Sequence, residues 1–115
     1  MSYTYIVNKD GDLIIAQEPE NPSYWKGKVQ GRKVIDCAAV PKSEEAVLLL
    51  EGACKNLVRI NCLGQVRWQS SMSGSSDFFI SIQLVESRLF ANSYNGWRCE
   101  LDFLTGTILS ESFVK

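Results

Sequence analysis

Hydrophobic and polar residues alternate along most of the chain, most clearly in residues 78–114. Alternation with a period of two, bounded by Gly, Asn and Ser, is typical of half-buried antiparallel strands. We therefore expect four strands in this part of the chain, at residues 78–84, 88–93, 97–103 and 107–114. In the first strand, the residues expected to face the core are Phe78, Ile80, Ile82 and Leu84. In the third, the inward residues are expected to be Trp97, Cys99, Leu101 and Phe103, with Arg98, Glu100 and Asp102 facing outward.

Further strands are predicted at residues 3–8, 12–16, 33–40, 45–51, 57–62 and 65–69. Residues 47–50 are all apolar, so strand 45–51 is expected to be buried on both faces. A short helix beginning at Ser43 is the alternative for this stretch. Residues 17–32, which contain Pro19 and Pro22, are predicted to form a long irregular segment.

Two segments about 40 residues apart repeat one pattern, the spacing of four-stranded propeller blades. Ile60-Asn61 and Leu101-Asp102 each end a strand, and each is followed by a short turn ending in Gly and by an apolar strand. Val7-Asn8, with Gly11, repeats half of this unit near the N-terminus. The repeat predicts that the sheets are copies of one design.

The residues Glu100-Leu101-Asp102-Phe103-Leu104-Thr105-Gly106 and Gly64-Gln65-Val66-Arg67-Trp68 resemble blades of the pyrroloquinoline-quinone-type β-propellers. In that family a strand ends in Leu-Asp, a Thr-Gly turn follows, and the next strand carries Trp. The resemblance implies two blades, at residues 33–69 and 78–114, preceded by a half-blade at 3–16. The chain departs from the pattern at Asn61-Cys62-Leu63-Gly64 and at Phe113, which stands in place of Trp. No quinone or calcium site carries over, because those sites need a whole ring of blades.

We therefore predict a single all-β domain, residues 1–115, built from antiparallel meander sheets. Two and a half blades cannot close a ring, so we expect a partial propeller-like arrangement, or a small β-sandwich or half-barrel. A lone meander leaves one face and two edges open. A homodimer or a protein partner is the alternative way to cover them, and we expect a monomer or a homodimer.

Charge and hydropathy exclude several functions. The net charge is −1 and the densest basic group is Lys26, Lys28, Arg32 and Lys33, which is too small for nucleic-acid binding. No apolar run reaches the roughly 20 residues that span a bilayer, so no membrane association is expected. The N-terminal residues lack the features of a signal peptide, and we expect a cytoplasmic protein.

The chain has no histidine, and its four cysteines form no C-x-x-C pair. This excludes the common zinc sites and Ser-His-Asp or Cys-His catalysis. Cys37, Cys62 and Cys99 are expected to be buried apolar residues, and Cys54 an exposed thiol. Glu100 and Asp102 alternate on an outward strand face, as solvent-facing patterning requires. We expect a protein that is not an enzyme and binds no cofactor or metal.

The longer loops, 17–32, 52–56, 70–77 and 93–96, are expected at one end of the sheets, and the tight turns, 8–11, 41–44, 62–64, 85–87 and 103–106, at the other. Exposed aromatic residues are typical of recognition surfaces. The candidate partner-binding residues are Tyr24, Trp25, Asp77, Tyr94, Trp97, Glu100 and Asp102. The alternative for Trp25 and Trp97 is that each folds back over the core.

The leading hypothesis is a non-catalytic protein-binding module, an immunity protein that blocks the active site of a cognate bacterial toxin. Outward acidic residues with aromatic anchors suit a basic nuclease-type toxin domain as the partner. One alternative is a small-ligand or carbohydrate binder that uses Trp25, Tyr94 and Trp97 as a stacking platform. Another is a subunit or fragment of a larger β-propeller.

Overall fold

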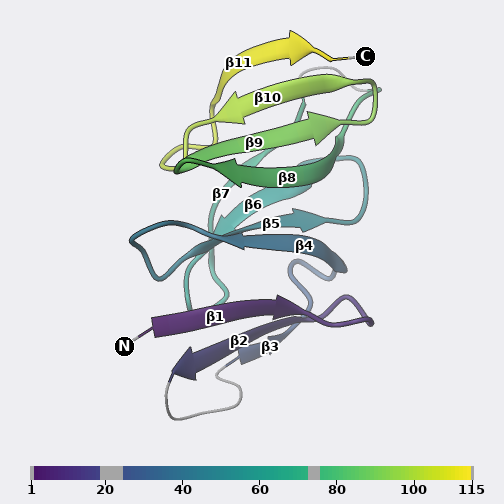
Figure 1. Ribbon diagram of the computed structural model, residues 1–115. Helices are drawn as coiled ribbons and strands as arrows, with labels where there is room; N and C mark the ends of the chain where they lie inside the picture. The colour runs from purple at the N-terminus through teal and green to yellow at the C-terminus, as the bar shows by residue number, and fades with distance from the viewer. Residues whose placement is uncertain (1, 19–24, 73–75, 115) are drawn as a thin grey trace.

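The computed structural model describes residues 2–18, 25–72 and 76–114, and this part of the chain contains strands and no helix (Figure 1). The structure contains three antiparallel meander sheets, which confirms the predicted all-β class. The alternative expectation, a short helix beginning at Ser43, is wrong, because Ala46–Leu50 form a strand. The N-terminal sheet contains β1 (Ser2–Val7), β2 (Leu13–Glu18) and β3 (Trp25–Gly27). The middle sheet contains β4 (Val34–Ala39), β5 (Ala46–Leu50), β6 (Leu57–Ile60) and β7 (Val66–Ser70). The C-terminal sheet contains β8 (Phe79–Val85), β9 (Arg88–Ser93), β10 (Trp97–Leu101) and β11 (Ile108–Phe113). Because no described residue is helical, no helix in these ranges is long and apolar enough to cross a membrane.

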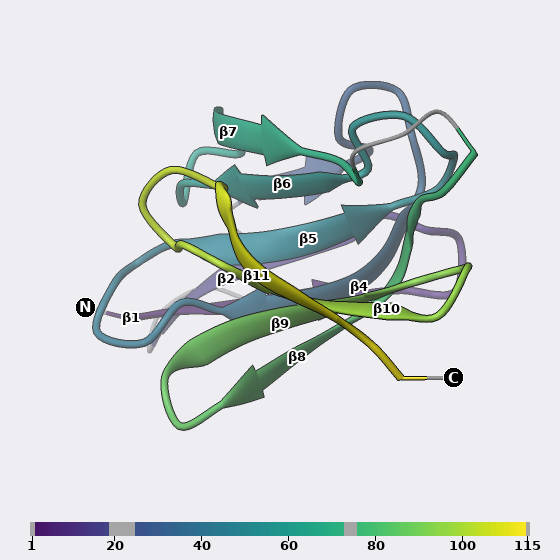
Figure 2. The ribbon, with the colours of Figure 1, turned by 90° about the horizontal axis from the view of Figure 1, so that it is seen from above.

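The middle sheet lies between the other two (Figures 1 and 2). All the residues of its strand β5 are buried, so the strand is covered on both faces. Alternate side chains of a strand point to opposite faces. Val47 and Leu49 accordingly enter the core shared with the C-terminal sheet. Ala46, Leu48 and Leu50 enter the core shared with the N-terminal sheet. The apolar run of residues 47–50 therefore exists because this strand contributes to two cores at once.

Each core is built from facing strands. The core between the middle and C-terminal sheets contains buried residues of both, which include Val47, Leu49, Leu57, Phe79, Leu89, Ala91, Cys99 and Leu101. The core between the N-terminal and middle sheets includes Leu13, Ile15, Val34, Leu48, Leu50, Val58 and Ile60. The three sheets thus form a stack, and among the described residues they do not close into a propeller ring.

The predicted repeat is visible as one turn used three times. In each turn the side-chain oxygen of the first residue, Asn8, Asn61 or Asp102, accepts the backbone N–H two residues later. Each turn ends in a glycine with positive φ: Gly11 at 80°, Gly64 at 78° and Gly106 at 75°. Asn and Asp favour such turns because their short side chains reach the backbone two residues ahead.

Two of these turn glycines receive a tryptophan from the neighbouring sheet. Trp25 of β3 packs on Gly64, where an added Cβ would lie 2.8 Å from the ring. Trp68 of β7 packs on Gly106, where the corresponding distance is 2.5 Å, and its Nε1 donates to the Phe103 carbonyl at 2.6 Å. Consecutive sheets are therefore joined by the same contact, an indole ring resting on backbone that has no side chain.

The prediction that Phe78 and Ile80 face the core is wrong. A β-bulge between Phe79 and Ser81 inserts one extra residue into β8, which reverses the facing of the residues before it. Phe79 is 1% exposed and Ile80 is 50% exposed. Beyond the bulge, Ile82 and Leu84 pack against the core as predicted.

The N-terminal hairpin, β1 and β2, has the opposite orientation to the one that the expected arrangement of loops and turns requires. Early in the hairpin, Tyr5 contacts Cys37 of β4 and the Glu44 carbonyl. At its turn, the Gly11 carbonyl accepts the Val34 N–H at 2.8 Å. β1 is therefore antiparallel to β4, and turn 8–11 lies at the end where β4 begins (Figure 1). The prediction that this turn lies with the other tight turns is wrong, because the reversed hairpin exchanges its two ends.

The contact between Trp68 and Gly106 can be tested with Gly31 as the control position. Both have positive φ, but an added Cβ meets the Trp68 ring at Gly106 and nothing within 4 Å at Gly31. We expect Gly31→Ala to lower the free energy of unfolding by about 1 kcal/mol, the cost of left-handed backbone. Gly106→Ala should cost about 1–3 kcal/mol more, because the ring must move. Urea unfolding measures both, and equal losses would show that the contact is not tight.

Candidate functional site

Asp77 organises the turn between β9 and β10. Its carboxylate accepts the backbone N–H groups of Phe78 at 2.9 Å and Asn95 at 3.0 Å. Burial by itself would raise the pKa of Asp77, but hydrogen bonds from the Ser93 hydroxyl and from backbone N–H groups hold the pKa below its ordinary value. Ser93 also accepts the Trp97 N–H at 3.1 Å. Asp77 therefore fixes the backbone of the turn that carries Tyr94 and Trp97.

Four aromatic side chains surround this turn, and we call them the aromatic end: Phe78, Tyr94, Trp97 and Phe113. The Phe78 and Tyr94 rings stack with centroids 5.2 Å apart, and the Trp97 and Phe113 rings meet edge to face at 5.3 Å. Tyr94 is 65% exposed, Phe113 56% and Trp97 37%. Their mutual contacts hold large apolar surfaces in fixed orientations while leaving them open to solvent.

The predicted acidic residues of the C-terminal sheet do not join the aromatic end. Glu100 faces outward and binds Arg88 through two hydrogen bonds of 2.9 and 2.6 Å, and this hydrogen bonding lowers the pKa of Glu100. Asp102 accepts the Leu104 N–H at 2.7 Å within its own turn. A different acid shares a sheet face with these rings: Glu111 lies opposite Cys99 in the register of β10 and β11, on the face that carries Trp97 and Phe113.

The remaining predicted residues are separated from this site. Trp25 lies against Gly64, in the turn between β6 and β7, which is the opposite end of the sheets from Tyr94. The stacking platform predicted for Trp25, Tyr94 and Trp97 is therefore not formed. Tyr24 lies outside the described residues. The structure brings together Asp77, Tyr94 and Trp97 from the predicted set.

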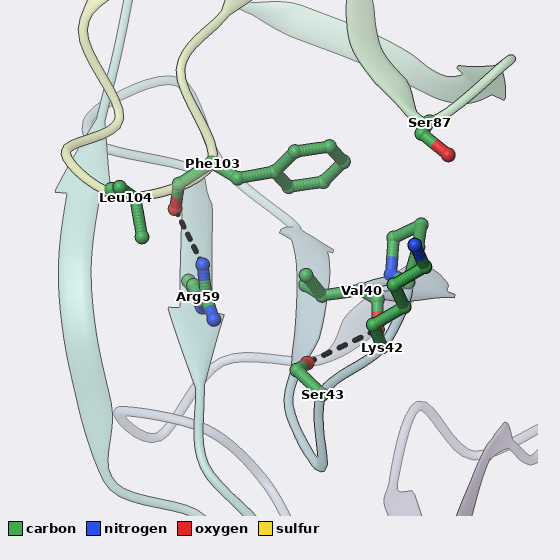
Figure 3. A pocket seen from close by; sticks show the side chains of 8 residues that line it. Val40, Lys42, Ser43, Arg59, Ser87, Phe103 and Leu104 are labelled. Atoms are coloured by element: carbon green, nitrogen blue, oxygen red, sulfur yellow. Dashed lines mark hydrogen bonds between the residues drawn. The ribbon is translucent and has the colours of Figure 1, made fainter.

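A pocket of about 380 Å³ opens at the other end of the C-terminal core (Figure 3). It lies between three turns, which join β4 to β5, β8 to β9 and β10 to β11. Its lining residues are Val40, Pro41, Lys42, Ser43, Arg59, Ser87, Phe103 and Leu104. Sequence reasoning missed this site, although one signal was present: Arg59 interrupts the apolar strand Leu57–Ile60.

Arg59 lines the pocket and is 9% exposed. Its Nε donates to the Glu45 carboxylate at 2.6 Å and its Nη1 to the Phe103 carbonyl at 2.8 Å. The other Glu45 oxygen lies 3.8 Å from Nε of Arg67. Arg59 thereby links the middle sheet to the turn that carries Phe103 and Leu104.

The two cysteines that lie in strands, Cys37 and Cys99, are poor nucleophiles at neutral pH. Burial raises the pKa of Cys99 to about 11 and also raises the pKa of Cys37, so both thiols are protonated at neutral pH. Cys54 is exposed, whereas Cys62 is half-buried. Within the described ranges no group of three or more potential ligands could hold a metal ion. The arrangement suits binding through the aromatic end and the pocket.

The role of Asp77 predicts a pH effect confined to its turn. A carboxylate with a lowered pKa contributes stability above its ordinary value, 3.8, and loses it as pH falls through the folded-state value. The amide resonance of Asn95 should therefore titrate below pH 3.8. Asp77→Asn should abolish this titration and speed hydrogen exchange at Asn95, whereas Asp102→Asn should affect only the turn around Leu104. An unchanged Asn95 titration in Asp77→Asn would refute this role.

A protein-family model matches the chain. The family described as "Domain of unknown function (DUF7957)" matches residues 40–113. These residues include β5–β11, and with them the aromatic end and all the residues that line the pocket. No curated protein matches the chain. Because the match spans more than half of the sequence, the chain belongs to this family, Domain of unknown function (DUF7957).

Proposed function

We propose that this protein is a non-catalytic protein-binding module, and more narrowly an immunity protein that binds and neutralises a cognate bacterial toxin domain in the cytoplasm. The observation that carries the binding proposal is the aromatic end. Three large rings there, Tyr94, Trp97 and Phe113, are held by neighbouring rings and remain between 37% and 65% exposed. Rigid, exposed Tyr and Trp side chains are the residues that dominate binding energy at protein interfaces.

The chemistry around these rings favours a basic partner. Exposed aromatic faces attract Lys and Arg side chains through cation–π contacts. Glu111 presents a carboxylate on the same sheet face as Trp97 and Phe113. A partner that inserts basic side chains between these groups would meet apolar surface and negative charge together. A nuclease-type toxin domain would present such basic side chains, because it contacts nucleic-acid phosphates with Lys and Arg.

The test compares variants of two exposed apolar residues at opposite ends of the molecule. Tyr94→Ala removes a ring that is 65% exposed, and Leu63→Ala removes a side chain that is 50% exposed in the turn between β6 and β7. Immobilised wild type and both variants are used to capture proteins from a lysate of the native host. The captured partner is then purified, and its affinity for each form is measured by titration calorimetry. Tyr94→Ala should weaken binding at least about tenfold, as expected for an interface hot spot, and Leu63→Ala should not.

The immunity role requires a second readout. The nuclease activity of the purified partner is assayed with an excess of each form of the protein. We expect wild type and Leu63→Ala to suppress the activity and Tyr94→Ala to suppress it only at higher concentration. Equal affinity of all three forms would contradict binding through the aromatic end. Undiminished partner activity with excess wild type would contradict the immunity role.

A further inference from the structure

We propose that the pocket lined by Arg59 and Lys42 binds a carboxylate attached to an apolar group. Its base is cationic and its walls are largely apolar, and this combination matches a ligand with those two parts. The proposal is independent of the proposed function, because the pocket and the aromatic end lie at opposite ends of the sheets.

The guanidinium of Arg59 is held in place for this role. Its hydrogen bonds to Glu45 and to the Phe103 carbonyl use Nε and Nη1 and fix the plane of the group. Its Nη2 has no hydrogen-bond partner among the described residues. A buried arginine whose Nη2 keeps both of its N–H donors in a fixed plane can bind an oxyanion without losing conformational freedom.

Two more donors stand at the rim. Neither the Lys42 ammonium nor the Ser87 hydroxyl has a hydrogen-bond partner in the described part of the chain, and both residues line the pocket. Ser43 is already engaged, since its hydroxyl donates to the Val40 carbonyl at 3.0 Å and accepts the Glu45 N–H.

The side chains that line the pocket carry a net positive charge. Lys42 and Arg59 are the charged residues of the lining, and the Glu45 carboxylate that pairs with Arg59 and Arg67 lies outside it. Glu44 and Glu86 belong to neighbouring turns but do not line the pocket. A ligand carboxylate would therefore meet an excess of donors and cations.

The apolar side chains of the pocket would contact the apolar group of the ligand. Figure 3 shows the Phe103 ring extending between Leu104 and the turn that carries Ser87, with Val40 and Arg59 below it in the view. Leu104 is 80% exposed, so its apolar side chain is available to contact a ligand. The volume of about 380 Å³ fits a small molecule or one terminal residue of a peptide.

The test is an NMR titration with 4-phenylbutyrate and its uncharged analogue 4-phenylbutan-1-ol. We expect the acid to shift the amide resonances of Lys42, Ser87 and Leu104 and to bind at least about tenfold more tightly than the alcohol, the ratio expected for charge-assisted hydrogen bonds. The peptide arm uses a short peptide ending in phenylalanine, with its terminus free or amidated. Tighter binding of the free peptide than of phenylbutyrate would identify a peptide terminus as the source, and the reverse would identify a small carboxylic acid.

Two lysines provide a matched pair of variants. Lys42 and Lys55 both have positive φ, 58° and 48°, and both are exposed, but Lys55 lies in the loop between β5 and β6 at the opposite end. Asparagine tolerates this conformation, so Lys42→Asn and Lys55→Asn should both fold. Lys42→Asn should weaken phenylbutyrate binding about fivefold, and Lys55→Asn should not change it. Arg59 is left intact because removing it would leave the half-buried Glu45 carboxylate without its closest cation.

Three results would overturn the proposal. The alcohol binding as tightly as the acid would show that the pocket has only apolar affinity. Equal phenylbutyrate affinity of Lys42→Asn and Lys55→Asn would show that the cation at the rim does not act on the ligand. No shift of the pocket resonances at millimolar phenylbutyrate would show that the pocket does not bind this class of ligand.

Discussion

The structure depends on the burial of β5 on both faces. Leu48 and Leu49 are neighbours in sequence, yet each belongs to a different core, and both are 1% exposed or less. A strand that is apolar on one face only would leave the middle sheet able to cover a single neighbour. The full burial of residues 46–50 makes the N-terminal and C-terminal sheets share one wall. Apolar burial on both sides of that wall drives the assembly of all three sheets.

Two tryptophan–glycine contacts set how the outer sheets pack against the middle sheet. Trp25 on Gly64 and Trp68 on Gly106 join successive sheets, and each glycine belongs to the same kind of turn. The second contact also positions the turn after β10, whose Phe103 carbonyl binds both Trp68 and Arg59. The pocket is therefore a consequence of how the C-terminal sheet docks. At the other end, Asp77 and Ser93 fix the turn that displays Tyr94 and Trp97.

The strands and the tight turns could be predicted from the sequence because both are local. Apolar patterning identified ten strands, one of them from a continuous apolar run, and Asn8, Asn61 and Asp102 each produced the turn that their side chains favour. The three-residue strand β3 was missed, because it has too few residues to show a period and pairs only through its neighbour β2. The facing of Phe79 depended on a bulge, and the direction of the first hairpin depended on contacts with β4. For the candidate sites, the aromatic residues could be seen in sequence, whereas the pocket required three turns and Arg59 to meet in space.

Hydrogen exchange in the native state tests most directly whether β5 makes the three sheets one cooperative unit. Leu49→Ala removes a side chain of the core between the middle and C-terminal sheets, at a cost of about 2–5 kcal/mol. If the sheets unfold together, amides of β2 and β10 should lose protection by the same factor, although β2 lies in the other core. Reduced protection in β8–β10 with unchanged protection in β2 would contradict the account, because the N-terminal sheet would then be stable without its shared wall.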